Sequence, residues 1–264
     1  MRPLAVVTGA SAGLGKEFAL QLAAAGYDLV LVARREAELH ALAAEVAKSH
    51  AAAHVLALDL GAADGPKRLC EALAAQGLHP DALVNNAGFG WLGEFADADP
   101  ANTLAMIQLN VAALVDLTAR LLPGMKARGR GKILNVASTA AFQPGPYMAV
   151  YYATKAFVLS FSEALHAELG GTGVTVTCLC PGPTKTEFAE VSGMNRTRLF
   201  DGGGVMTAEA VARDGVRGLQ RGRRLVVSGF ANRLMTFAVR FLPRAAILHI
   251  VKRIQRTRTG EPRA

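Results

Sequence analysis

Short apolar runs alternate along the chain with longer segments that place apolar residues at helical spacing. The short runs are Leu4–Val7, Leu29–Val32, Val55–Leu58, Ala82–Val84, Ile133–Val136, Val174–Leu179 and Leu225–Val227. They are continuous and rich in β-branched residues, which is typical of parallel strands covered on both faces. The longer segments are Leu14–Ala25, Glu36–Lys48, Pro66–Ala75, Pro100–Leu122 and Val150–Leu169. This order predicts βαβ units with right-handed crossovers, and therefore a doubly wound α/β fold with a parallel sheet of about seven strands.

We expect the chain to divide into one domain, residues 1–229, and a tail, residues 230–264. No repeat, low-complexity segment or linker interrupts the first part, and no helix is assigned in its polar, glycine-rich stretch 181–224. The tail carries an apolar stripe at helical spacing. Its members are Leu234, Phe237, Phe241, Ile247, Ile250 and Ile254. Because proline lacks the N–H and clashes with the preceding turn, we expect helical segments from Phe230 to Arg258 that break near Pro243.

The net charge of +8 is concentrated in the tail. From Gln220 onward the chain carries 11 Lys and Arg residues and one acid, Glu261, whereas the rest is close to neutral. A basic helix with an apolar stripe can lie in a membrane interface, or pack on its own domain or on a second subunit. We therefore expect a homo-oligomer or a peripheral membrane contact. Nucleic acid is not expected, because the basic residues accompany an apolar face and no recognised binding motif.

The cysteines indicate a reducing compartment. Cys70, Cys178 and Cys180 are odd in number and lack the spacing of a disulfide framework. Alternation along a strand sends Cys178 and Cys180 to one face, where two buried small side chains are favoured over a metal or redox pair. The six histidines show no metal-ligand spacing, so no metal is expected.

The start of the chain and its apolar runs bear on localisation. Only Met1-Arg2-Pro3 precedes the first predicted strand, so no signal peptide is expected. The chain also has no uninterrupted run of 18 apolar residues, and so no spanning helix is expected. The expected location is the cytoplasm, with the tail allowing contact at the inner membrane surface.

A glycine-rich turn follows the first predicted strand. Residues 8–15 read Thr-Gly-Ala-Ser-Ala-Gly-Leu-Gly and open a helix. Gly9, Gly13 and Gly15 let the backbone turn tightly and approach a pyrophosphate, while the helix start offers free N–H groups to the anion. The spacing differs from the commoner Gly-x-Gly-x-x-Gly, and a tight connection is the alternative. The position after the first strand of a parallel sheet favours dinucleotide binding.

Two arginines follow the second predicted strand. Domains that bind NAD usually place an acid there for the ribose 2′-hydroxyl, but this chain has Arg34 and Arg35. A guanidinium can hold a 2′-phosphate through a charge-assisted contact. The alternative, a solvated helix start, is disfavoured because cations are unfavourable at a helix N-terminus. The pair predicts NADP(H) as the cofactor.

Tyr151 and Lys155 lie one helical turn apart on a predicted helix, so both project from one face. A nearby ammonium is expected to lower the pKa of the tyrosine and let it exchange a proton with an alcohol or alkoxide. Such a pair also occurs on ordinary helix surfaces. Tyr147 and Tyr152 are set aside, because Tyr151 is the tyrosine with a lysine four residues later.

Further motifs accompany this pair between Thr8 and Gly182. In chain order they are the Thr8–Gly15 turn, Asp59, Asn85-Asn86-Ala87-Gly88, Asn110, Ser138, Tyr151 with Lys155, and Pro181-Gly182. Their joint spacing resembles that of the classical short-chain dehydrogenase/reductase family. The resemblance implies a single Rossmann-type catalytic domain that binds NADP(H). The tail is similar to those of a bacterial subgroup akin to 3-oxoacyl and steroid reductases.

The resemblance also implies a role for each matching residue. Asn110, Ser138, Tyr151 and Lys155 would form a catalytic tetrad. Ser138 would bond the substrate oxygen, Tyr151 would exchange the proton, Lys155 would also bind the nicotinamide ribose, and Asn110 would hold a relay water. The implied cofactor contacts are Gly9, Ser11, Gly13, Leu14, Gly15, Asp59, Leu60, Asn86, Ala87, Gly88, Pro181, Gly182 and Thr184, besides Tyr151 and Lys155. Taken alone, the Asn85–Gly88 stretch is an ordinary turn and Ser138 an ordinary helix cap.

The segment from Thr186 to Met206 is implied to be a lid over the substrate, although a loose surface loop is equally compatible. Its apolar side chains are candidates for a substrate wall. They are Phe188, Val191, Met194, Leu199 and Phe200. The sequence thus predicts an NADP(H)-dependent oxidoreductase that interconverts a carbonyl and a secondary or primary alcohol on a hydrophobic small molecule. The alternatives are a non-catalytic dinucleotide-binding sensor or scaffold on the same fold, and a membrane-surface interaction protein.

Overall fold

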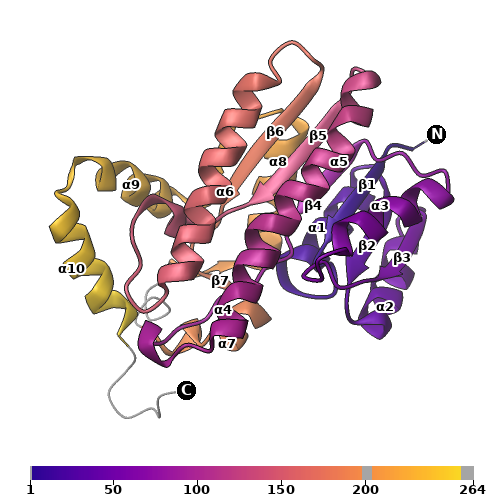
Figure 1. Ribbon diagram of the computed structural model, residues 1–264. Coiled ribbons are helices and arrows are strands. Elements are labelled where there is room, and N and C mark those ends of the chain that lie inside the picture. Colours follow the sequence, from indigo (N-terminus) through magenta and orange to yellow (C-terminus); the bar gives the residue numbers. More distant parts are fainter. Residues whose placement is uncertain (1, 198–203, 257–264) are drawn as a thin grey trace.

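The computed structural model describes residues 2–197 and 204–256. Seven parallel strands form one sheet in the order β3-β2-β1-β4-β5-β6-β9 (Figure 1). They are β1 (Leu4–Thr8), β2 (Asp28–Ala33), β3 (Ala53–Ala57), β4 (Ala82–Asn85), β5 (Gly131–Val136), β6 (Val174–Cys180) and β9 (Leu225–Val227). The predicted parallel sheet and its seven strands are confirmed, with β3 beginning two residues earlier than its apolar run.

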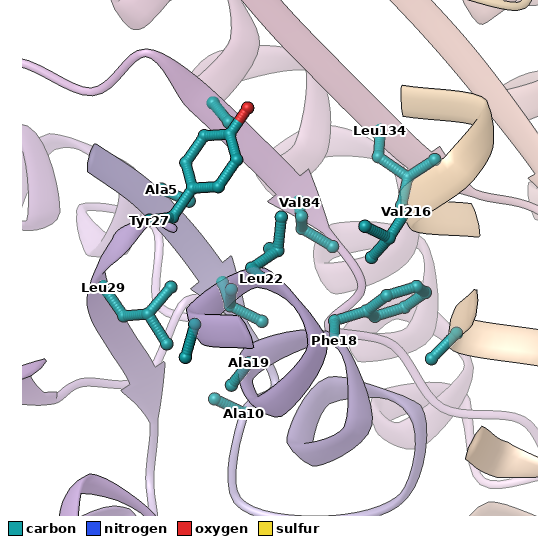
Figure 2. Close-up of a cluster of buried hydrophobic side chains, with 14 of the residues drawn as sticks. Ala5, Ala10, Phe18, Ala19, Leu22, Tyr27, Leu29, Val84, Leu134 and Val216 are labelled. Atoms are coloured by element: carbon teal, nitrogen blue, oxygen red, sulfur yellow. The ribbon is translucent and has the colours of Figure 1, made fainter. Parts of the chain in front are cut away.

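Helices cover both faces of the sheet. One face carries α1 (Gly13–Ala24), α2 (Glu36–Ala47) and α8 (Ala208–Gln220), and the other carries α3 (Gly65–Ala75), α5 (Leu114–Ala127) and α6 (Ala149–Glu168). Side chains of β1 alternate between the two cores: Ala5 and Val7 join the first, whereas Leu4 and Val6 join the second. Figure 2 shows the first core, where Phe18 and Leu22 of α1 lie near Val84 and Val216. This alternation explains why the strands read as continuous apolar runs.

The strand order reverses between β1 and β4. From β1 the chain winds outward through β2 and β3, and from β4 it winds in the opposite direction through β5 and β6. In an open parallel sheet, the crevice at such a switch point, beyond the carboxyl ends of the strands, is where ligands bind. All strands of this sheet are parallel, so the segments that follow them meet at the same edge.

Two helical features differ from the prediction. The helix expected over residues 100–122 consists of α4 (Pro100–Ile107), a π-helical turn (Gln108–Ala113) and α5, which continues past Pro123 to Ala127. Pro123 is exposed, so water can satisfy the carbonyl that it leaves without a partner, and the burial of Met125 beyond it favours helix. The second difference is in the stretch 181–224, where no helix was assigned but α7 (Glu187–Val191) and α8 lie.

The helical stretch Pro100–Ala127 is long and apolar enough to cross a membrane, with a mean hydropathy of 1.4 over its most apolar window. Our sequence criterion, an uninterrupted run of 18 apolar residues, excluded it. In the structure this stretch is part of the folded domain. Leu114, Leu117 and Met125 are buried in the cores, and α5 packs against α3 and β5. This packing accounts for the apolar residues of α5, whereas Leu104 and Ile107 of α4 are exposed.

The tail forms α9 (Phe230–Ala238), a 3₁₀ turn (Val239–Phe241) and α10 (Arg244–Gln255), and projects from one side of the sheet in Figure 1. The expected break at Pro243 is therefore confirmed as far as residue 256. Ile247 and Val251 are buried with Tyr151 and Tyr152 of α6. The domain covers only this inner side, because the remaining members of the predicted stripe are exposed. The division at residue 229 stays a prediction.

Candidate active site

A cavity of about 930 Å³ lies at the carboxyl edge of the sheet. Almost every residue singled out from the sequence lines it. They are Gly9, Ser11, Gly13, Leu14, Arg34, Arg35, Asp59, Leu60, Asn86, Ala87, Gly88, Ser138, Tyr151, Lys155, Pro181, Gly182 and Thr184. Gly15 and Asn110 lie behind its wall. The structure thus brings together, at the predicted crevice, residues from segments far apart in the sequence.

The glycine positions of the turn after β1 do not readily accept side chains. Gly9 and Gly13 have positive φ angles of 65° and 53°, which side chains disfavour. At Gly15, a Cβ atom would lie 2.0 Å from the carbonyl oxygen of Gly9, so Gly15 is required for close packing of the turn on α1. The turn therefore leaves bare backbone facing the cavity at the start of a helix, which fits a dinucleotide phosphate.

The segment after β4 is held against the end of β1. Thr8 Oγ1 accepts hydrogen bonds from the backbone N–H groups of Asn86 and Ala87, at 2.9 and 3.0 Å. Asn86 Nδ2 in turn donates to the carbonyl of Thr8 at 2.9 Å. Asn85 points the other way and donates to Thr118 and Asn135 inside the domain. Asn86 and Ala87 thus face the cavity, whereas Asn85 is a buried structural residue.

The two arginines have different surroundings. Arg35 donates to Ser11 Oγ at 3.2 Å and forms an ion pair with Glu187 at 3.1 Å. Arg34 is exposed beside the cavity and forms no ion pair within residues 2–197 and 204–256. The Arg35 guanidinium therefore lies at the glycine-rich turn, and Arg34 lines the same cavity. Asp59, the acid after β3, also lines the cavity and accepts a bond from the backbone of Gly61 at 2.8 Å.

Asn110 lies in the π-helical turn between α4 and α5, and its side chain is fully engaged. Its Oδ1 accepts from the backbone N–H of Phe89 at 3.0 Å, and its Nδ2 donates to the Phe89 carbonyl at 2.9 Å and to Thr154 at 3.2 Å. A π-helical turn is often found at functional sites. Here it places Asn110 against the Gly88–Phe89 backbone, directly behind the cavity.

Ser138, Tyr151 and Lys155 meet on the cavity wall. Ser138 follows β5 and caps a short 3₁₀ helix by accepting from the backbone N–H of Ala140. Its hydroxyl donates to the carbonyl of Pro181 at 3.4 Å, and its side chain lies close enough to Tyr151 to favour the phenolate. Lys155 Nζ lies 5.8 Å from the centre of the Tyr151 ring and donates to the carbonyl of Val136 at 2.8 Å. Both Tyr151 and Lys155 are buried. These three members of the predicted tetrad therefore lie together, with the tyrosine beside a serine and the ammonium nearby.

Burial determines the proton affinity of both groups in the protein alone. It raises the pKa of the Tyr151 phenol well above its usual value, and the neighbouring Ser138 side chain opposes this shift only in part. It lowers the pKa of Lys155 to about 8, although the nearby thiols of Cys178 and Cys180 raise it. The expectation that the pKa of Tyr151 is lowered is therefore wrong for the protein alone, because desolvation of the phenol is the largest influence on that pKa.

The other wall of the cavity is apolar. The predicted Phe188, Val191 and Met194 line it, on or near α7 (Glu187–Val191), whereas Leu199 and Phe200 lie outside the described residues. Sequence reasoning missed a second contribution, from the tail. Its lining side chains are Met235, Ala238, Val239, Leu242, Ile247, Ile250, Val251 and Ile254. The tail is thus part of the site.

Two polar residues, one lining the cavity and one behind it, were also missed. Gln143 lines the cavity, and its buried Oε1 has no hydrogen-bond partner within the described part of the chain. Gln255 of α10 is buried and donates to the Tyr152 hydroxyl at 2.5 Å. Tyr152, next to the central tyrosine in sequence, therefore anchors the tail rather than facing Ser138.

The three cysteines are free, and Cys178 and Cys180 lie in β6 with their sulfur atoms 3.9 Å apart. Both are buried in the same core, as the alternation predicted. Within the described residues, no three His, Cys, Asp or Glu side chains gather as metal ligands.

Comparison with known proteins identifies the same motifs. Residues 3–196 match the family model described as short chain dehydrogenase. A sulfoacetaldehyde reductase of Chromohalobacter salexigens is 39% identical over 212 residues, which cover 78% of this chain and 83% of that protein. A very-long-chain 3-oxoacyl-CoA reductase of Phaeosphaeria nodorum is 38% identical over 180 residues, 66% of this chain and 53% of that protein.

A solved structure extends the likeness over nearly the whole chain. It is a short-chain dehydrogenase from Sphingobium yanoikuyae in complex with NADPH, with a TM-score of 0.80 and 30% sequence identity. The match covers 98% of each chain, so it includes the tail as well as the sheet.

Proposed function

The chain belongs to the short-chain dehydrogenase family, and from this premise we propose that it is an NADP(H)-dependent oxidoreductase that interconverts a carbonyl and an alcohol on a hydrophobic substrate. The observation that carries the proposal is the meeting of Ser138, Tyr151 and Lys155 on the wall of a cavity that continues to the glycine-rich turn. A sensor that only binds a dinucleotide has no need of this arrangement.

The chain's own residues account for the proton chemistry. The bound nicotinamide dinucleotide supplies or accepts the hydride. Ser138 holds the substrate oxygen, and Tyr151, which keeps its proton because burial raises its pKa, donates that proton to the oxygen during reduction. Lys155 lies close enough to favour the phenolate that remains, because its ammonium is a buried positive charge 5.8 Å from the ring centre.

The cofactor residues fit an extended dinucleotide on one side of this centre. These residues line the cavity: the Gly9–Gly15 turn would hold the pyrophosphate, Asp59 and Leu60 the adenine end, and Thr184 the nicotinamide end. Arg34 and Arg35 favour a 2′-phosphate through charge-assisted contacts. NADP(H) is therefore the proposed cofactor.

The apolar wall supports a hydrophobic substrate. Side chains of α7, α9 and α10 surround the substrate side of the cavity, and Gln143 offers one unpartnered polar atom. A pocket of this kind selects molecules that bury apolar surface and carry few polar groups.

A turnover screen with purified protein tests the proposal. Aldehydes, ketones and 3-oxoacyl compounds of increasing chain length would be offered with NADPH and with NADH. We expect NADPH-dependent reduction, with kcat/KM rising with apolar length. Cofactor binding without turnover of any of these compounds would instead favour the sensor, and a preference for NADH would contradict the interpretation of Arg34 and Arg35.

A further inference from the structure

We propose that α9 and α10 dock on an anionic lipid surface and that the substrate cavity opens toward that surface. The docking is argued from the tail alone, whereas entry of the substrate from the lipid surface rests on the function proposed above. The ligand class that follows is a carbonyl compound or alcohol with a long apolar part, taken up from the membrane.

An exposed apolar stripe is the first observation. Phe230, Leu234, Phe237 and Phe241 recur at intervals of three or four residues, which places them on one side of the helix. Their exposed fractions are 81%, 60%, 57% and 72%, so the domain does not cover them. The rings of Phe237 and Phe241 pack edge to face with centres 5.1 Å apart, which makes a continuous aromatic surface. Such a patch marks an interaction site.

Charge is the second observation. Six basic residues accompany the stripe between residues 230 and 256, and the chain has no Asp or Glu from residue 215 to residue 260. They are Arg233, Arg240, Arg244, Lys252, Arg253 and Arg256, all exposed. A helix that combines exposed aromatic side chains with this charge fits the interface of a bilayer with anionic headgroups.

The cavity mouth is the third observation. Met235, Leu242 and Ile250 line the cavity, and they are also 40%, 45% and 47% exposed. The apolar wall of the cavity therefore continues onto the outer surface of the tail, and Met235 belongs to α9, which also carries most of the exposed stripe. A hydrophobic molecule that leaves a bilayer at this surface reaches Tyr151 without crossing water.

A lipid surface is favoured over a second copy of the chain. Two tails that met face to face would bring twelve basic side chains together without an acid between residues 215 and 260 to balance them. α10 has 12 residues, fewer than the ~20 that span a bilayer, so the tail lies in the interface and does not cross it.

Vesicle co-sedimentation of the full chain tests the docking. The parent protein is expected to sediment with phosphatidylcholine vesicles that contain phosphatidylglycerol, and to be released by high salt. Phe237→Ser combined with Phe241→Ser should weaken partitioning by about tenfold or more, as should Arg240→Glu combined with Arg244→Glu. Phe95→Ser is the matched control, because Phe95 is 67% exposed but lies outside the tail, and it should leave partitioning unchanged.

The same preparations separate the docking from the proposed function. Anionic vesicles should raise the rate for a long-chain ketone in the parent but not in the Phe237→Ser, Phe241→Ser variant, whereas both should reduce a short water-miscible ketone equally. Absence of binding to anionic vesicles would overturn the docking. So would a tail variant that turns an oligomer into a monomer, because the stripe would then be a subunit contact. Vesicle binding without turnover of either ketone would overturn the entry route and the proposed function, and leave the docking.

Discussion

At the scale of single residues, burial determines which proton carriers the site offers. The hydroxyl of Tyr151 keeps its proton over the physiological range, and the ammonium of Lys155 loses its proton at about pH 8. A lysine that is buried without a carboxylate partner titrates low because the charged form is poorly solvated. Near pH 7 the site therefore holds a neutral phenol and an ammonium that loses its proton as the pH rises through about 8.

The pKa of Lys155 predicts that capture of the cofactor depends on pH. The folded-state pKa of Lys155 lies below its ordinary value, so the ammonium is present below about pH 8 and lost above it. We expect kcat/KM for NADPH, which reports the free enzyme, to be flat near pH 7 and to fall as the pH rises through about 8. A profile that stays level to pH 10 would show that Lys155 keeps its charge.

Coenzyme choice also belongs to this scale. Replacement of Arg34 and Arg35 by alanine should weaken NADPH binding by about tenfold or more, and NADH binding far less. Arg35 also forms an ion pair with Glu187, so a 2′-phosphate must compete with this carboxylate for the guanidinium. Glu187→Gln should therefore tighten NADPH by about two- to fivefold, since exposed ion pairs are weak. Isothermal titration of both coenzymes distinguishes these effects, and an equal change for NADH would refute a phosphate-specific role.

At the scale of elements, one hydrogen bond joins the tail to the catalytic helix. Gln255 of α10 donates to Tyr152 of α6, one residue from Tyr151. Ile247 and Val251 bury their side chains beside it. The position of α10, and with it the apolar wall, thus depends on contacts with the helix that carries the chemistry.

Gln255→Ala should loosen this wall without touching the proton relay. We expect KM for a long apolar ketone to rise several-fold while kcat for a small ketone changes little, because a buried hydrogen bond contributes about 1 kcal/mol. Tyr152→Phe should act in the same direction, and the double variant should be less than additive. Equal losses of kcat for both substrates would mean that the contact supports Tyr151 itself.

A local sequence pattern predicts an element when the burial of that element can be read from its own residues. Strand runs such as those of β1 and β2 are apolar on both faces, so the parallel sheet follows from the sequence. α8 was not predicted from the sequence, because Gly215 and Gly218 lower its helix propensity. A Cβ atom at Gly215 would lie 2.8 Å from Phe18, so these glycines permit close packing that only the tertiary structure explains.

At the scale of the whole molecule, the cavity has a cofactor side, which sequence motifs predict, and a tail side, which they do not predict. Glycine spacing and the Tyr151–Lys155 pair located the cofactor side, because a motif is recognised from its own residues. The tail side was missed, since Ile247 and Tyr151 are far apart in sequence and apolar spacing does not reveal which cavity a helix covers. Homo-oligomerisation stays a prediction; Leu104, Ile107 and Phe157 are exposed apolar side chains on which to test it.

The most direct test of the account is Tyr151→Phe, with Tyr152→Phe as the matched control. Each variant loses one hydroxyl on the same helix, but the Tyr151 side chain lies beside Ser138, whereas the Tyr152 hydroxyl accepts from Gln255. NADPH binding would be followed by fluorescence titration and ketone reduction by steady-state rates. We predict that Tyr151→Phe binds NADPH within about twofold of the parent and loses turnover by about 100-fold or more, whereas Tyr152→Phe keeps turning over a small ketone. Residual activity of Tyr151→Phe within about tenfold of the parent would contradict the assignment of Tyr151 as the proton donor.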